Sequence, residues 1–171
     1  RCSADVAMPT PGHIPVLLDE VVSLLAPRAG EVYVDCTAGL GGHAVAVARA
    51  MGTGTIVLGD LDPDNLSRAQ HNVRDAAPGV TVHAVRGNFA ALPHAVAKLG
   101  LKANTVLADL GFASTQVDDA SRGLSFQREG PLDMRLDPTS PLTAAALIAS
   151  APERELERLI RDFGEDRLAR P

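Results

Sequence analysis

The segment from Glu31 to Met51 constrains the fold of this chain more than any other. It begins with a β-branched and aromatic run that ends at Asp35 and Cys36, which is typical of a buried strand. A glycine loop follows at residues 39–42, and the small apolar residues after it predict a helix up to Met51. A strand that leads through a glycine loop into a helix starts a βαβ unit, so the sequence predicts an α/β fold.

Strands and helices continue to alternate after this unit. Further strands are predicted at residues 55–58, 80–85 and 105–109, and further helices at residues 15–26, 63–76, 89–99 and 152–163. Right-handed crossovers would make the sheet parallel and gather the carboxyl ends of its strands at one edge. The loops that should line this edge follow Asp35, Asp60, Val85 and Asp109. Residues 111–140 are rich in Gly, Pro, Asp and Ser, which predicts a long loop of functional character.

Composition excludes several classes of protein. The chain has 171 residues, of which 46% are hydrophobic, enough for one domain with its own core. Its apolar runs are too short to cross a bilayer, and its first residues lack the features of a targeting peptide, so we expect a cytoplasmic protein. The net charge of −5 argues against nucleic-acid binding through bulk positive charge. Cys2 and Cys36 are expected to be free thiols.

The glycine loop and Asp60 predict an adenosine-containing ligand. Residues 39–44 fit the pattern G-x-G-x-x-A, and Asp60 lies at the distance along the chain expected of a carboxylate that binds a ribose hydroxyl. The alternatives are a tight turn without a ligand and a carboxylate that only caps a helix. Asp62 is better placed for that cap, because Pro63 follows it. We therefore expect Gly39, Gly41, Gly42 and Asp60 to bind ligand.

Charge separates two ligands of this class. A dinucleotide would bring its pyrophosphate to the glycine loop, where the carboxylate of Asp35 would repel it. S-adenosylmethionine carries an ammonium and a sulfonium instead, and Asp35 would attract both. The sequence favours S-adenosylmethionine as cofactor. An NAD-dependent oxidoreductase remains an alternative, although the single tyrosine, Tyr33, lies in a strand and forms no Tyr-x-x-x-Lys pair.

From about His13 to Arg167 the chain resembles the RsmH (MraW) family. The matching segments are HIPVLLDE at residues 13–20, YVDCTAGLGGH at 33–43, DLG at 109–111, QVDD at 116–119, RGLSF at 122–126 and GPLDMRLDP at 130–138. The resemblance implies an S-adenosylmethionine-dependent methyltransferase acting on a cytidine amino group in small-subunit ribosomal RNA. It also implies a Rossmann-like class I methyltransferase sheet, of which the chain would hold the first four or so strands.

The resemblance assigns a donor site and a domain organisation. The donor-binding residues it implies are Gly41, Gly42, His43, Asp60, Phe89, Asp109 and Gln116. From the residues alone, Phe89 is as consistent with core packing as with covering a purine, and His43 with packing at a helix start; a lone histidine is poor evidence for a metal, and we expect none. The expected domains are a flexible N-terminal extension at residues 1–12, a partial donor-binding domain at 13–117, an acceptor-side loop at 118–140 and a truncated helical insertion at 141–171.

Asp109 is the candidate catalytic residue. At the end of its strand it could accept hydrogen bonds from the cytosine amino group as the methyl is transferred, or it could only orient the donor. The candidate RNA contacts are Ser114, Arg122, Arg128 and Arg135. Neighbouring carboxylates could instead pair with these arginines. The resemblance implies ribosomal RNA or the small ribosomal subunit as the partner, although the sequence contains no basic patch to bind it.

The chain departs from the family pattern in two respects. Phe112-Ala113-Ser114-Thr115 replaces an aliphatic residue, two serines and a proline, and Leu40 and Ala44 replace a basic residue and a serine. A class I sheet also has about seven strands, whereas four are predicted here. We therefore expect an open sheet edge that permits self-association, and we weigh a truncated donor-binding paralogue with little or no turnover as an alternative to the enzyme.

Overall fold

The computed structural model describes residues 15–112 and 114–169. The expected extension at residues 1–12, with Cys2, and the matching residues His13 and Ile14 lie outside these ranges. The chain divides into two compact units, residues 1–113 and residues 114–171. The first unit contains a parallel sheet and its helices, and the second contains the loop-rich region and the last helices.

The first unit is built on a four-stranded sheet in the order β3-β2-β1-β4. The strands are β1 (Val32–Asp35), β2 (Gly54–Asp60), β3 (Val80–Arg86) and β4 (Thr105–Leu107). All three neighbouring pairs are parallel, with Asp35 opposite Leu58 of β2 and Leu107 of β4. The predicted α/β class and the Rossmann-like parallel sheet are therefore confirmed. The carboxyl ends of the strands share one edge, as the βαβ crossovers require.

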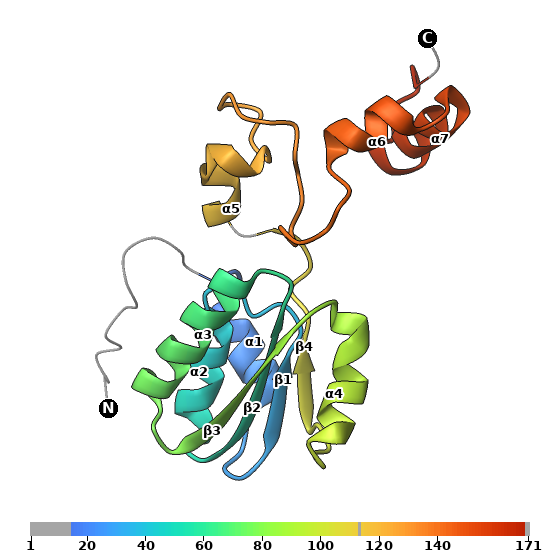
Figure 1. Cartoon of the computed structure of the whole chain (residues 1–171). Coiled ribbons are helices and arrows are strands. Elements are labelled where there is room, and N and C mark those ends of the chain that lie inside the picture. The colour runs from blue at the N-terminus through green and yellow to red at the C-terminus, as the bar shows by residue number, and fades with distance from the viewer. Residues whose placement is uncertain (1–14, 113, 170–171) are drawn as a thin grey trace. The chain divides into compact units, whose positions relative to one another are not determined.

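Helices cover both faces of this sheet (Figure 1). The helices α1 (Leu18–Leu25), α2 (Gly42–Met51) and α3 (Pro63–Ala76) lie on one face, and α4 (Leu92–Lys98) lies on the other. Successive strand residues alternate between the faces. Tyr33, Ile56 and Leu58 pack in the larger core beside α2 and α3, while Val34 and Val57 pack with α4.

The limits of the helices depend on local backbone chemistry. The helix expected at residues 63–76 has those bounds, and Asp62 caps it by accepting hydrogen bonds from the amides of Asp64 and Asn65. The helix expected from Pro15 begins instead at Leu18, because Leu17 has left-handed backbone angles, with φ at 53°. The helix expected at residues 89–99 is divided into a 3₁₀ segment, Phe89–Ala91, and α4.

The second unit contains more helix than the sequence predicts. Within the expected loop lie α5 (Ser114–Asp118) and a 3₁₀ segment, Ala120–Arg122, followed by α6 (Ala144–Ser150) and α7 (Glu153–Gly164). α7 was expected, whereas α6 was not. Thr143 starts α6, since its hydroxyl accepts a hydrogen bond from the amide of Ala146. In the described part of the chain, none of the helices is long and apolar enough to span a membrane.

Candidate donor site

The carboxyl end of β2 is tied directly to the glycine loop. Asp60 is the last residue of β2, and its Oδ2 accepts a hydrogen bond of 2.8 Å from the amide of Gly39. Its Oδ1 accepts a second bond of 2.8 Å from the amide of Asp62. Each carboxylate oxygen has a further lone pair with which it can accept a bond from a ligand. Asp60 is therefore an organiser of the loop as well as a candidate ribose contact.

Asp60 is half-buried between these two amides. Burial raises its pKa, while the bonds from the Asp62 and Gly39 amides oppose that rise. The expectation that Asp62, rather than Asp60, caps α3 is confirmed by its bonds to Asp64 and Asn65. Asp60 nevertheless has a structural role of its own, because its carboxylate already accepts two hydrogen bonds from backbone amides.

The glycine loop lies tightly against α3. Gly41 has a positive φ of 84°, and a side-chain carbon on it would approach the Ala69 Cα to 2.9 Å. Asn72 fixes the neighbouring residue, since its Nδ2 donates a bond of 2.9 Å to the carbonyl of Leu40. Only glycine satisfies both the backbone angles and the close approach at residue 41. The loop conformation is thus set by helix packing on one side and by Asp60 on the other.

Asp35 lies beneath this loop and is only 1% exposed. Its Oδ2 accepts a hydrogen bond from the Tyr33 hydroxyl and its Oδ1 accepts one from the Thr37 amide, both at 3.1 Å. Burial raises the pKa of Asp35 to about 6, which the Thr37 and Tyr33 bonds and the nearby His43 partly oppose. A direct contact between Asp35 and a ligand stays a prediction. In this position its charge would act on a cationic ligand through space.

Replacing Asp35 by asparagine is expected to remove the contribution of this carboxyl to the pH dependence of stability between about pH 4 and pH 6. The folded-state pKa is about 6, whereas an aspartate in an unfolded chain titrates near ~3.9. Within this window the folded chain holds a proton that the unfolded chain has released. The free energy of unfolding should therefore fall by roughly 2 to 3 kcal/mol as the pH rises. Urea unfolding at a series of pH values measures this slope.

Asparagine fits the site, because its oxygen can accept from Thr37 while its amide donates to the Tyr33 oxygen. Asp64→Asn makes the same change at an exposed carboxyl and should retain the wild-type slope. A wild-type stability that stays level between pH 4 and pH 6 would contradict the assignment.

His43 and Phe89 take different positions around the loop. His43 is 9% exposed, and its Nε2 donates a bond of 2.9 Å to the carbonyl of Val16. This bond fixes the segment before α1 against the start of α2. Phe89 is 47% exposed at the start of its 3₁₀ segment, after the end of β3. Its ring is therefore not core, and a role in covering a purine stays a prediction.

Asp109 is exposed beyond the end of β4, and its backbone is held by a residue that the sequence analysis did not select. The amide of Asp109 donates a hydrogen bond of 2.7 Å to the Thr37 hydroxyl oxygen. Thr37 follows β1, so this bond joins the exits of two neighbouring strands. The sequence held no signal for this contact, because it depends on the register of the parallel sheet.

The other predicted contacts belong to the second unit. Gln116 is buried in α5, and Ser114 is the first residue of that helix, with a side chain outside the described part. Arg122 donates to the carbonyl of Leu136, at 3.0 Å. Arg128 pairs with Asp118 at 3.3 Å, and Arg135 pairs with Asp133 at 2.7 Å.

These arginine contacts organise the loop within the unit. Arg135 also donates to the carbonyls of Pro138 and Ser140. The Arg135 guanidinium lowers the pKa of Asp133 to about 2. Arg128 and Arg135 thus form the ion pairs with neighbouring carboxylates that the sequence suggested. Binding of RNA by these arginines stays a prediction.

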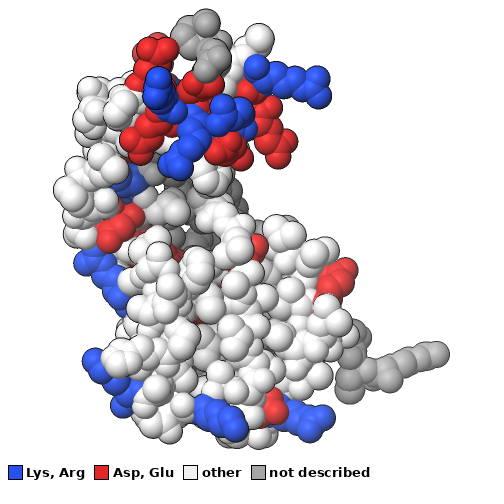
Figure 2. All heavy atoms as spheres, turned by 90° about the vertical axis from the view of Figure 1, so that its right-hand side faces the viewer, with Lys and Arg blue, Asp and Glu red and all other residues white. Residues whose placement is uncertain are grey.

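Charge is acidic at three of the four strand ends of the first unit. The segments 32–48, 55–66 and 105–112 contain Asp35, Asp60, Asp62, Asp64 and Asp109 but no lysine or arginine, whereas β3 ends at Arg86, opposite Asp60. On the face drawn in Figure 2, acidic and basic side chains of the second unit are interspersed, and the coloured residues form no continuous basic surface. The chemistry of the strand ends suits a cationic ligand better than a pyrophosphate.

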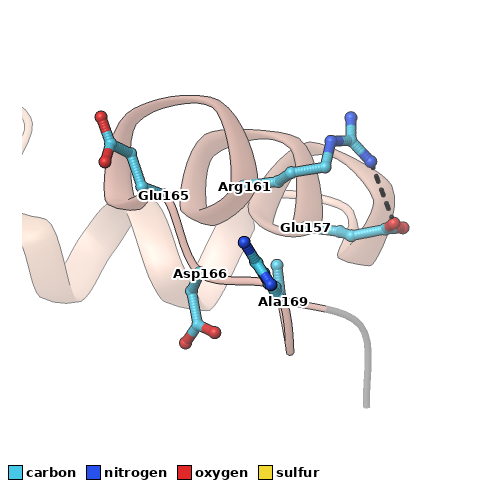
Figure 3. A pocket seen from close by; sticks show the side chains of 6 residues that line it. Glu157, Arg161, Glu165, Asp166 and Ala169 are labelled. Carbon is cyan, nitrogen blue, oxygen red and sulfur yellow. Dashed lines mark hydrogen bonds and ion pairs between the residues drawn. The ribbon is translucent and has the colours of Figure 1, made fainter.

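Neither a metal-binding cluster nor a surface pocket coincides with the predicted site residues in the described part of the chain. Among residues 15–112 and 114–169, no cluster of His, Cys, Asp and Glu could hold a metal ion. A shallow pocket of about 510 Å³ lies in the second unit. Its lining residues are Glu157, Arg161, Glu165, Asp166, Arg167 and Ala169. Figure 3 shows the ion pair between Arg161 and Glu157 beside it, with a distance of 3.2 Å. None of the predicted site residues contributes to this pocket.

Comparison with known proteins matches nearly the whole chain to one family. The sequence model of the MraW methylase family matches residues 10–171. The chain is 43% identical over 161 residues to the ribosomal RNA small subunit methyltransferase H of Heliobacterium modesticaldum, covering 92% of this chain and 51% of that protein. It is 46% identical over 159 residues to the protein of the same name from Burkholderia cenocepacia, covering 92% and 49%. The chain thus spans about half the length of the curated relatives it matches.

Among solved structures, an RNA methyltransferase from Salinibacter ruber in complex with S-adenosyl-L-homocysteine is similar at 23% identity. The alignment covers 72% of each chain with a TM-score of 0.45.

Proposed function

Because the chain belongs to the MraW methylase family, we propose that its first unit binds S-adenosylmethionine and that the protein methylates a cytidine amino group in small-subunit ribosomal RNA. The observation that supports this most is Asp60, whose carboxylate fastens the glycine loop and keeps lone pairs for a ribose. The names of the relatives support ribosomal RNA as the substrate class. That substrate would locate the protein in the cytoplasm.

The residues of the site suit this cofactor. A methyl donor with an ammonium and a sulfonium gains from the carboxylates at the strand ends, where a pyrophosphate would be repelled. The buried charge of Asp35 would add to this attraction from beneath the loop. When bound, S-adenosylmethionine supplies a methyl group that is already activated, so the protein has mainly to position the reactants and exclude water.

We assign the following roles within the first unit. Asp60 accepts the ribose hydroxyls, the backbone of Gly41 and Gly42 approaches the ligand closely, and the exposed ring of Phe89 covers the adenine. Asp109 lies at the exit of β4, where its carboxylate would accept hydrogen bonds from the acceptor amino group. In the second unit, we propose Gln116 as a further donor contact. The proposed RNA contacts of that unit are Ser114, Arg122, Arg128 and Arg135.

Isothermal titration of the chain with S-adenosylmethionine, S-adenosylhomocysteine and NAD tests the proposal. We expect the two sulfur compounds to bind with dissociation constants in the micromolar range, about −8 kcal/mol, and NAD to bind at least tenfold more weakly. Adenosine serves as a control that retains the ribose but lacks the amino acid. Tight binding of NAD without binding of either sulfur compound would refute the assignment and favour the oxidoreductase alternative.

A donor-binding protein without turnover is the second candidate, and the departures from the family pattern at Ala113 and Thr115 favour considering it. Transfer of labelled methyl groups to small ribosomal subunits lacking this modification distinguishes the two. Donor binding with little or no transfer by the chain supports a binding unit. Sustained transfer by the same chain would establish the enzyme and exclude the second candidate.

A further inference from the structure

At each end of the β1–β4 pair, a side-chain oxygen accepts a hydrogen bond from a backbone amide of the other strand segment. Along this pair, Tyr33 lies opposite Thr105 and Asp35 lies opposite Leu107, an offset of 72 residues. The last backbone bond runs from the amide of Cys36 to the carbonyl of Leu107, at 2.8 Å. One step further, Thr37 lies in register with Asp109, and there the threonine hydroxyl oxygen takes the place of a backbone acceptor at 2.7 Å.

The opposite end of the pair has a matching arrangement. The amide of Val32 donates a hydrogen bond of 2.8 Å to the side-chain oxygen of Asn104, and the amide of Asn104 donates to the carbonyl of Val32. Both terminal bonds therefore join a backbone amide to a side chain across the same two strands. They differ in position, because only the Thr37 bond lies at the carboxyl end, beside the glycine loop and Asp109.

The backbone of Thr37 is held in turn by the buried side chain of Asp35. Its amide donates to Oδ1 of Asp35, and the Tyr33 hydroxyl donates to Oδ2 of the same carboxylate. The result is a continuous series of hydrogen bonds from the buried core to Asp109. Beyond Asp109 the chain passes through Gly111, which has a φ of 147°, with no atom near the position of a side-chain carbon. The Thr37 hydroxyl thus holds the β4 exit two residues before Gly111.

We propose that Thr37 is a positioning residue, whose hydroxyl holds the backbone of Asp109 at the donor site. This inference rests on the proposed donor-binding function, and it adds a role for a residue that makes no ligand contact in that proposal. Without the hydroxyl, the Asp109 amide would lose its acceptor and the carboxylate would sample positions away from the donor. Thr37 would therefore control donor affinity through Asp109.

Three variants of the chain separate this role from general stability. Thr37→Val keeps the branched shape but removes the acceptor, Thr37→Ser keeps the hydroxyl, and Asn104→Ala removes the matching bond at the far end of the strand pair. Loss of one hydrogen bond of ordinary strength predicts that Thr37→Val weakens S-adenosylhomocysteine binding by about three- to tenfold. Thr37→Ser and Asn104→Ala should stay within about twofold of wild type, since both keep the bond to Asp109.

Amide hydrogen exchange, followed by nuclear magnetic resonance, gives a readout that does not need the ligand. The Asp109 amide should exchange about five- to tenfold faster in Thr37→Val and at the wild-type rate in Thr37→Ser. In Asn104→Ala the faster amide should be that of Val32 instead. In an Asp109→Ala background, Thr37→Val should cause no further loss of affinity, because its effect acts through the Asp109 carboxylate.

The outcomes are distinguishable. Equal loss of donor affinity in Thr37→Val and Asn104→Ala would show that only stability is involved and would overturn the inference. Faster exchange at Asp109 with unchanged donor affinity would overturn it as well. Failure of the wild-type chain to bind any donor would refute the proposed function instead, while the exchange rates would still report whether Thr37 holds Asp109.

Discussion

Replacing Asp60 by asparagine is expected to weaken S-adenosylhomocysteine binding by about tenfold to hundredfold, the range for loss of a hydrogen bond to a charged group. The carboxylate uses one oxygen for the Gly39 amide and the other for the Asp62 amide. Asparagine has a single acceptor oxygen, so its amide group would direct N–H bonds towards one of these N–H donors. The variant therefore loses both the charge offered to the ribose and one of the two bonds that shape the loop.

Isothermal titration measures the change, with Asp62→Asn as the matched control. Asp62 accepts from Asp64 and Asn65 through one oxygen, which asparagine retains. Its donor affinity should stay within about threefold of wild type. Methylthioadenosine, which has the ribose but not the amino acid, should lose the same factor with Asp60→Asn as S-adenosylhomocysteine does. Equal losses in Asp60→Asn and Asp62→Asn would exclude a specific ribose contact.

The largest expected effect on stability comes from Gly41→Ala. At a φ of 84° the new side chain strains the backbone, and its carbon would approach the Cα, Cβ and carbonyl oxygen of Ala69 to 2.9, 3.1 and 3.2 Å. Left-handed strain and overpacking together predict a loss of about 2 to 4 kcal/mol in the free energy of unfolding. Because Ala69 is part of the α3 backbone, the helix as a whole would have to move. Urea unfolding measures the loss, and Tyr33, the single tyrosine, reports on the first unit.

Gly39→Ala provides the comparison for this effect. Gly39 also has a positive φ, of 51°, but the nearest atom to its side-chain position is the Thr37 carbonyl oxygen at 3.9 Å. The backbone strain alone predicts a loss of about 1 kcal/mol. The difference between the two variants isolates the contact with α3. Similar losses in both variants would mean that the loop does not depend on its packing against Ala69.

Where local chemistry determines an element, the sequence predicted it closely. The limits of α3 follow from Asp62 and Pro63 at its start and from Pro78-Gly79 beyond its end, and the structure has the expected bounds. The start of α1 was missed because Leu17 adopts a left-handed conformation for which the sequence contains no glycine or asparagine signal. α6 was missed because its sequence, AAALIAS, is apolar throughout and lacks the polar positions that give an amphipathic helix its period of 3.6 residues.

The sequence predicted most residues of the candidate site, but not how deeply each side chain is buried or which side chains contact one another. The sequence identified Asp60 and the glycine loop from spacing, and the structure joins them by a hydrogen bond. It also selected Asp35, but the side chain lies under the loop with both oxygens bonded, a depth that depends on the packing of β1 between its neighbours. Thr37 carried no signal, since its partner is 72 residues away and is reached only through the register of a parallel sheet.

The hydrogen bonds of Asp60 and Asn72 to the glycine loop, together with its packing against Ala69, have a consequence for the entropy of binding. These contacts are made between parts of the protein itself, so we expect the loop to lose its conformational freedom during folding and not on association. A ligand that meets an ordered loop gives up less of its interaction energy to arranging the protein. Variants that loosen the loop would then raise the entropic cost of association even when every contact to the ligand is preserved.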